Sequence, residues 1–164
     1  MSSESNSLCP SVVALDVDAR DLNAALLAAA QLAGKTCRRD PASIYRALSR
    51  REQVGSTALG QAIAIPHARI DGISQRFTLF LRLRTPIDFG APDGKLVNKL
   101  YVILVPMGGS TDDHLQFLAR VASSLSDRLL RSRISEAADG AAVQRAFAAW
   151  ESDADAAMAM AGHA

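Results

Sequence analysis

The chain has 164 residues, a mass of 17.4 kDa and a formal net charge of +1. Its 49% hydrophobic and 21% charged residues are typical of a globular protein, which excludes disorder along the whole chain. The near-neutral charge disfavours a surface that binds nucleic acid, and no segment has the ~20 apolar residues of a membrane span. Two cysteines, Cys9 and Cys37, form neither a metal quartet nor a disulfide framework, so free thiols indicate a cytoplasmic protein.

The first third of the chain predicts a strand followed by two helices. Residues 1–10 are rich in serine, and we expect them to be flexible. Apolar residues then recur first in a short run and later at helical spacing, with aspartates placed to cap the helices. The predicted elements are a strand over residues 11–17, a helix from Asp18 or Asp21 to a stop at Gly34, and a helix from Asp40-Pro41 to about Glu52.

The rest of the chain predicts three strands and three helices. The strands are expected over residues 61–66, 77–83 and 98–106, of which the last is apolar enough to be central. The helices are expected over residues 113–125, 127–134 and 141–150. From residue 152 the chain is rich in Ala, Met and Gly, and we expect a disordered tail to residue 164.

This order of elements predicts an α/β fold with helices on both faces of the sheet. The strands between Gly55 and Phe80 have no helix between them, so we expect a mixed β-sheet of about five strands rather than a purely parallel one. A single domain is expected over residues 11–151.

Histidine chemistry is the main functional signal. His67 directly follows the predicted strand 61–66, so we expect its ring at the carboxyl edge of the sheet, where ligand sites of α/β proteins usually lie. The preceding loop, residues 55–60, is rich in small and hydroxyl side chains that can offer donors to an anion. His114 lies in the first turn of a predicted helix, whose dipole disfavours imidazolium. His163 lies in the predicted tail and is assigned no function.

A structural reading of these residues is also open. A lone histidine beside a strand is most often a structural residue, and a Ser-Thr loop is more often a turn than an anion cradle. The 47 residues between His67 and His114 give no metal-ligand spacing. Walker loops, nucleophile elbows and dinucleotide fingerprints are absent from the sequence. The residues by themselves therefore predict an α/β domain with one candidate histidine site.

The segment GSTALGQAIAIPH, residues 55–67, resembles the active-site signature of enzyme IIA domains of the mannitol/fructose type in the phosphoenolpyruvate:sugar phosphotransferase system. Later blocks extend the resemblance: RTPIDF at 84–89 followed by Asp93-Gly94, the apolar run at 100–106, and DHLQFLA at 113–119. It covers residues 12–150 and is most similar to the nitrogen-regulatory (Ntr) subgroup, a stand-alone cytoplasmic protein. The resemblance implies the enzyme IIA type 2 fold.

The resemblance also implies the site. His67 would be the tele-phosphohistidine acceptor, a phosphotransferase component that takes its phosphoryl group from an HPr-type phosphocarrier. Arg51 and His114 would flank it and contact phosphoryl oxygens, with Ser56 and Thr57 as lesser donors. Within its Arg-Arg-Glu run, Arg51 is chosen for its spacing of 16 residues before His67. No cofactor and no metal are implied, because the donor is already a high-energy phosphoramidate.

Three alanines depart from the family pattern. Ala58, Ala62 and Ala68 stand where the family often has glycine. If those positions need positive φ, each alanine would cost ~1 kcal/mol or more. Each would also add a methyl group in front of a docking partner, which we interpret as a change in partner affinity rather than a loss of phosphorylation.

Three functions remain open at this point. The first is a regulator whose phosphorylation state controls target proteins, such as potassium transport or sensor-kinase systems. The second is a sugar-transport enzyme IIA that passes the phosphoryl group to a IIB domain. The third is a binding-only module that keeps the fold without phosphotransfer. Neither nucleic acid nor membrane insertion is expected in any of them.

Overall fold

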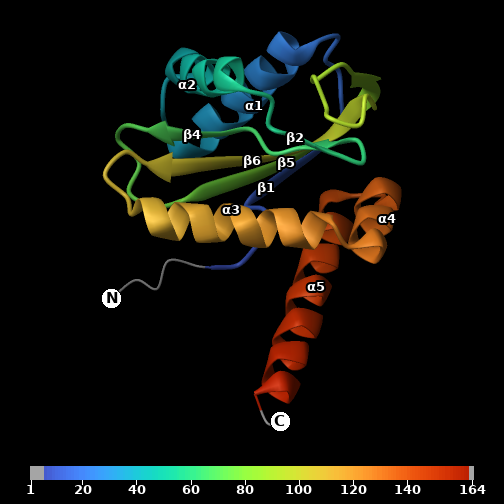
Figure 1. The fold of residues 1–164 in the computed structure, drawn as a ribbon. Coiled ribbons are helices and arrows are strands. Elements are labelled where there is room, and N and C mark those ends of the chain that lie inside the picture. Colours follow the sequence, from blue (N-terminus) through green and yellow to red (C-terminus); the bar gives the residue numbers. More distant parts are fainter. Residues whose placement is uncertain (1–5, 163–164) are drawn as a thin grey trace. The chain divides into compact units, whose positions relative to one another are not determined.

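The computed structural model describes residues 6–162 and divides the chain into two compact units (Figure 1). One unit, Pro10–Thr111, contains the sheet and two helices. The other combines the N-terminal segment up to Cys9 with the chain from Asp112 onward. The sequence predicted one domain over residues 11–151, without this division.

The sheet is mixed, as the sequence predicted, and has six strands. They are β1 (Val12–Val17), β2 (Ala58–Gly60), β3 (Ile63–Ala64), β4 (His67–Ile70), β5 (Phe77–Ile87) and β6 (Val97–Pro106). Strand β6 is central, antiparallel to β5 on one side and parallel to β3 and β4 on the other. Strand β1 is parallel to β5, and β2 pairs antiparallel with β3.

The sequence prediction was wrong about the strand before His67. The expected strand 61–66 is reduced to the two residues of β3, and His67 opens β4 opposite Ile103 instead of following a strand at the sheet's carboxyl edge. Pro66 explains the break, because it has no N–H for the ladder. Its carbonyl still accepts from Ile103 N–H at 2.9 Å, so the chain stays beside β6. Part of the predicted loop 55–60 is also a strand, β2.

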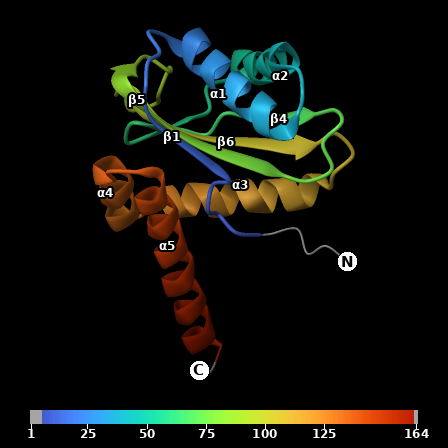
Figure 2. The same ribbon diagram turned by 180° about the vertical axis from the view of Figure 1, so that it is seen from behind.

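Two helices cover one face of this sheet, α1 (Leu22–Cys37) and α2 (Pro41–Val54) (Figures 1 and 2). The buried face of α1 consists mostly of alanine, which lets the helix approach the strands closely. The core contains Leu26, Ala29, Ile44, Leu48, Leu79, Leu81, Leu100 and Val102, among others. Strand β4 contributes Ala68 and Ile70 to it, and His67 and Arg69 alternate with them.

Gly34 does not end α1, contrary to the sequence prediction, and the helix continues to Cys37. A Cβ at residue 34 would lie 2.8 Å from the Arg39 carbonyl oxygen and 2.9 Å from Pro41 Cγ. This glycine is therefore required for the close approach of the chain between α1 and α2, rather than as a stop signal.

The other unit consists of α3 (Thr111–Leu125), α4 (Arg128–Glu136), α5 (Gly140–Ala161) and the N-terminal segment. Leu8 is fully buried, and its N–H donates to Glu151 Oε1 at 2.8 Å. The Ser7 hydroxyl donates to the same oxygen at 3.0 Å. The prediction of a flexible N-terminus is therefore wrong for residues 6–9, while residues 1–5 lie outside the described part.

The predicted disordered tail is also corrected. Helix α5 was expected to end near residue 150 but continues to Ala161. Alanine has the highest helix propensity, and five of residues 152–161 are alanine, so low sequence complexity here favours a helix. His163 and Ala164 lie outside the described residues. None of the helices in residues 6–162 combines the length and apolar character needed to cross a membrane.

Asp21 and Asp40 begin α1 and α2, as the sequence predicted, and their side chains accept backbone N–H bonds at these helix starts. Asp127 and Asp139, which the sequence analysis did not single out as caps, do the same at the starts of α4 and α5. The carboxylate satisfies a backbone donor that has no partner inside the helix and also complements the helix dipole. These local caps explain why the helix starts were predictable from sequence.

Candidate functional site

The end of α2 and the start of β4 bring Arg51 and His67 together. Arg51 Nε lies 3.2 Å from His67 Nε2, and His67 Nδ1 lies 2.8 Å from the Ile65 carbonyl oxygen. The imidazole is half-buried, and these two contacts engage both of its ring nitrogens. Helix α2 positions the first partner and the chain just before β4 supplies the second.

These two contacts define the tautomer of His67. The Ile65 carbonyl can only accept, so Nδ1 carries the proton and donates. Arg51 Nε can only donate, so Nε2 offers its lone pair. A neutral ring with Nδ1–H satisfies both contacts, whereas imidazolium would place a second proton against the guanidinium. The ring nitrogen that carries a lone pair instead of a proton is therefore Nε2.

Burial lowers the pKa of His67 below its ordinary value. The hydrogen bond to Ile65 and the Glu52 carboxylate raise the pKa, and the Arg51 charge adds to the lowering. The balance favours the neutral ring near pH 7, which is the nucleophilic form.

Arg51 is oriented for this contact by its own helix end. Its Nη1 donates to the Gly55 carbonyl at 2.9 Å while Nε faces His67. The neighbouring Arg50 is exposed. Since a helix turns by about 100° per residue, adjacent arginines cannot face the same side. The structure thus brings the arginine at the predicted spacing of 16 residues to the histidine.

Ser56 and Thr57 use their hydroxyl groups within the loop. Ser56 Oγ donates to the Phe89 carbonyl at 2.6 Å and accepts from Ala58 N–H at 3.1 Å. Thr57 Oγ1 lies 2.7 Å from Glu52 Oε2. Both residues hold the segment between α2 and β2 in place, and the contacts shown for their hydroxyls are with the protein itself.

Glu52 is a site residue that the sequence analysis did not single out. Its Oε1 accepts from Thr57 N–H at 2.8 Å, while Thr57 is only 7% exposed. The carboxylate therefore fixes the loop that follows α2. In the sequence, only its position next to Arg51 and five residues before Thr57 could have identified Glu52. An Arg-Arg-Glu run at a helix end is usually a solvent-exposed surface, so this signal is weak.

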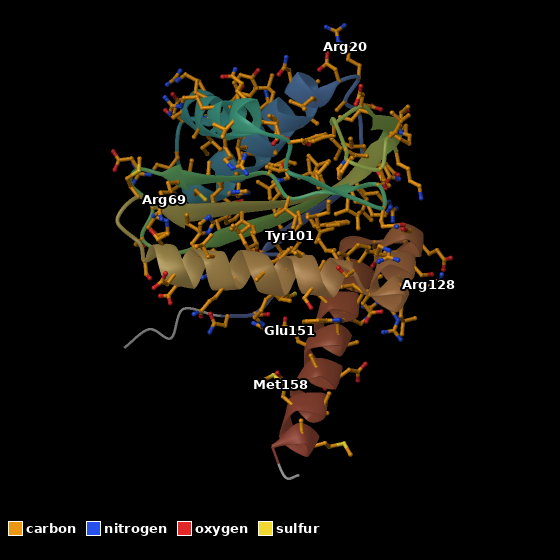
Figure 3. All side chains as sticks on the ribbon, in the orientation of Figure 1. Arg20, Arg69, Tyr101, Arg128, Glu151 and Met158 are labelled. Carbon is orange, nitrogen blue, oxygen red and sulfur yellow. The ribbon has the colours of Figure 1, made fainter. Side chains whose placement is uncertain are left out.

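Arg69 was also missed. It lies two residues after His67, and its Nη1 donates to the carbonyls of Met107 and Gly109 at 3.4 and 3.2 Å. Its Nη2 donates to Thr111 Oγ1 at 3.0 Å. Figure 3 labels this side chain beside β4. Arg69 therefore ties the strand of the histidine to the loop that follows β6.

Only one of the three alanine departures occupies a glycine-like conformation. Ala62 has φ +66° and follows Gln61 at φ +57°, whereas Ala58 and Ala68 do not have positive φ. Ala58 and Ala68 are buried members of the core, so their methyl groups do not face a docking partner. The expectation of strain therefore holds at Ala62 alone.

His114 lies in the first turn of α3, in the unit that begins at Asp112, and is half-buried. Its predicted place beside His67 stays a prediction. Within residues 6–162, no group of three or more His, Cys, Asp and Glu side chains is arranged to hold a metal ion.

Known proteins are similar to this chain in sequence. The family model for the phosphoenolpyruvate-dependent sugar phosphotransferase system, EIIA 2, matches residues 7–150. A nitrogen regulatory protein of Bradyrhizobium diazoefficiens is 36% identical over 120 residues, which cover 73% of this chain and 75% of that protein. A fructose-specific EIIA component of Haloferax volcanii is 39% identical over 116 residues, covering 71% and 73%. Some further nitrogen regulatory relatives are matched over 63–66% of their length.

A solved structure gives the same result. The crystal structure of the nitrogen regulatory protein IIA-Ntr from Neisseria meningitidis superimposes with a TM-score of 0.78 at 32% identity, covering 82% of this chain and 92% of that one. The family match spans both the Arg51–His67 contact and α3. The chain therefore belongs to the EIIA 2 family of the phosphoenolpyruvate-dependent sugar phosphotransferase system.

Proposed function

We propose that His67 Nε2 accepts a phosphoryl group from the phosphohistidine of an HPr-type phosphocarrier. Family and relatives support a phosphoryl-carrier or regulatory role in the phosphotransferase system. The observation that carries the choice of atom is the pair of contacts on the imidazole. Nδ1–H is engaged by the Ile65 carbonyl, which leaves Nε2 as the nucleophile.

The transfer needs no proton to leave Nε2. Its lone pair forms the new N–P bond while the N–P bond of the donor breaks, and the bonding electrons return to the donor imidazole. Positive charge that develops on the His67 ring is stabilised through Nδ1–H by the Ile65 carbonyl. The ring is thus oriented before the donor arrives, which lowers the entropic part of the barrier.

Arg51 has two successive partners in this proposal. In the free protein its Nε–H covers the His67 lone pair, and this hydrogen bond must open before attack. The planar guanidinium then faces the incoming phosphoryl oxygens and neutralises their charge in a loose transition state. We assign His114 the role of a second N–H donor to these oxygens, and Ser56 and Thr57 a supporting role through the loop that they hold.

The favoured output is regulation of target proteins by the phosphorylation state of His67, in the cytoplasm. Similarity to nitrogen regulatory proteins supports it. A second candidate is transfer to a IIB domain, favoured by the similarity to a fructose-specific EIIA component. Proteins of this family pair with phosphocarriers and IIB domains, whereas a potassium transporter or sensor kinase as the target belongs to the proposal.

Intact-mass measurement tests the proposal. The chain is incubated with phosphoenolpyruvate, enzyme I and an HPr-type phosphocarrier. We expect a gain of one phosphoryl group that is lost in His67→Ala and retained, at a lower rate or with a shorter lifetime, in His114→Ala. Phosphorylation of His67→Ala would contradict the site, and absence of transfer to the intact chain would favour a binding-only module. Adding a IIB domain to the phosphorylated chain distinguishes transport from regulation, because only a transport component passes its phosphoryl group on rapidly.

A further inference from the structure

Helix α5 has two halves with different surroundings. Its first half buries Val143, Ala146 and Phe147, whereas almost every residue beyond Glu151 is exposed. We call residues 152–161 the arm. Figures 1 and 2 both show it continuing past α4 without another described segment of its unit beside it, and Figure 3 shows Met158 on it. The arm lies beyond residue 150, where the family match ends.

The arm leaves apolar side chains uncovered. Met158 and Met160 are 75% and 79% exposed, and a helical segment of about ten residues is marginal in water by itself. Burying a methionine side chain at an interface removes its apolar surface from water, which lowers the free energy of the complex. A partner that covers one side of the arm is therefore favoured energetically.

The same unit contains a hollow between α4 and α5 of about 490 Å³. Its lining consists mostly of small side chains, including Ala138, Ala142 and Ala149. Arg133 and Arg145 also line it. Two arginines against one acid, Glu136, make its lining positive. The hollow thus offers room for an apolar side chain together with an attraction for carboxylates.

The side of α5 that lines the hollow runs on into the arm. Its lining residues Ala142, Arg145 and Ala149 are followed by Asp153, Ala156 and Met160 at spacings of three and four. This spacing averages 3.6 residues, so all six lie along one side of the helix. The first half of that side contains Arg145 and borders the hollow. The second half contains Asp153 and the exposed Met160.

We propose that this side of α5 is an interface with a second copy of the chain, in which two α5 helices pair antiparallel about a twofold axis. Pairing Arg145 with Asp153 of the second copy places Ala149 near the axis. The same register brings Met160 of each copy to Ala138 at the hollow of the other. The Arg145–Asp153 pair and the Met160–Ala138 contact each occur twice, as the twofold symmetry of a closed dimer requires.

The charge pairs select the register, and the alanines allow close approach of the two helices. Association through one helix side is small in area, so we expect a weak dimer with a Kd on the order of micromolar. The proposal does not depend on phosphorylation of His67, and its test uses no phosphoryl donor.

Sedimentation velocity over a range of concentrations tests it with the full chain. Arg145→Glu and Asp153→Arg each create two like-charge pairs, and we expect each to weaken dimerisation about tenfold or more. An equimolar mixture of the two variants restores both attractive pairs, so heterodimers form with near wild-type affinity. Recovery in the mixture also shows that both variants are folded.

Matched controls lie on the other side of the arm. Asp155 and Met158 are about 200° around the helix from Asp153 and Met160. We therefore expect Asp155→Arg and Met158→Glu to dimerise like the wild type and Met160→Glu to be weakened. A wild-type chain that is monomeric at ~1 mM overturns the proposal. So does a dimer insensitive to Arg145→Glu, equal effects of the Asp153 and Asp155 variants, or a mixture that stays monomeric.

Discussion

The ends of α2 and α5 differ in what holds them. At the end of α2, Arg51 and Glu52 bind the following loop, the histidine ring and Thr57 through hydrogen bonds of 2.7–3.2 Å. At the end of α5, the side chains of the arm are mostly exposed to solvent, and the helix there depends mainly on helix propensity and backbone hydrogen bonds. The first end is preorganised, so deleting single atoms should change chemistry and stability. The second is a local helix, so substitutions there should change association rather than the fold.

The largest effect is expected at Arg51. Arg51→Ala removes the guanidinium that we propose faces the phosphoryl oxygens, and we expect phosphoryl transfer to slow by about 10²–10³-fold. Rates from rapid-quench phosphorylation measure this, with Arg50→Ala as the exposed neighbour that should stay near wild type. Equal rates in the two variants would remove Arg51 from the transfer step.

Arg51→Ala and Arg50→Ala should also differ in the pH dependence of phosphoryl transfer. Because the pKa of His67 is lowered, its nucleophilic neutral form persists below the ordinary imidazole pKa of about 6.5, and transfer should fall only at lower pH. Removing the Arg51 charge raises the pKa of His67, so in Arg51→Ala the fall should begin at higher pH. NMR titration of the His67 ring checks the direction, and Arg50→Ala should leave it unchanged.

Glu52→Ala should cost stability at the end of α2. It leaves the buried Thr57 N–H without its acceptor, which costs about 1–3 kcal/mol in the free energy of unfolding. Glu52→Gln keeps an acceptor oxygen and should recover most of this. Urea denaturation measures both, with the exposed Gln53→Ala as the control. A loss as large in Gln53→Ala would point to helix α2 itself rather than the loop contact.

Ala62→Gly should stabilise the protein by about 1 kcal/mol, because Ala62 has positive φ and glycine adopts that conformation without steric cost. Ala68→Gly provides the contrast: Ala68 lies in β4 without positive φ, so glycine there should destabilise by about 0.5–1 kcal/mol. Thermal unfolding of the two variants should therefore shift in opposite directions, and a shift in the same direction would refute the strain at Ala62.

The smallest effect is expected in the arm. Ala156→Gly should change the global free energy of unfolding by less than about 0.5 kcal/mol, since the arm can fray while the packed half of α5 stays folded. Ala146→Gly, in the buried half, should cost about 1 kcal/mol. Measuring both at low concentration, where the chain is monomeric, compares the two halves directly. Equal losses would show that α5 unfolds as one unit.

Local signals account for what the sequence predicted well. Asp21 and Asp40 cap helices through residues two or three positions away, and the apolar runs mark β5 and β6. Predictions failed where tertiary contacts decide. Gly34 is needed because the chain doubles back to Arg39 and Pro41, and residues 6–9 are held in place because Leu8 reaches Glu151, more than 140 residues away.

The candidate site shows the same division. The motif around His67 and the spacing of Arg51 identified two of its residues, while Glu52 and Arg69 were missed because their partners are recognisable only in the folded chain. Ser56 and Thr57 were singled out as donors, but their hydroxyls hold the loop.

By itself, the sequence determined the types of element, most helix starts and the choice of His67 as the candidate histidine, because caps, periodicity and a short motif act over a few residues. The tertiary structure decided which ring nitrogen of His67 donates to the Ile65 carbonyl, which arginine faces the other nitrogen, and that the arm is a helix. Those properties depend on hydrogen bonds and surfaces formed by segments far apart in the chain, whose meeting requires the sheet and helices to pack.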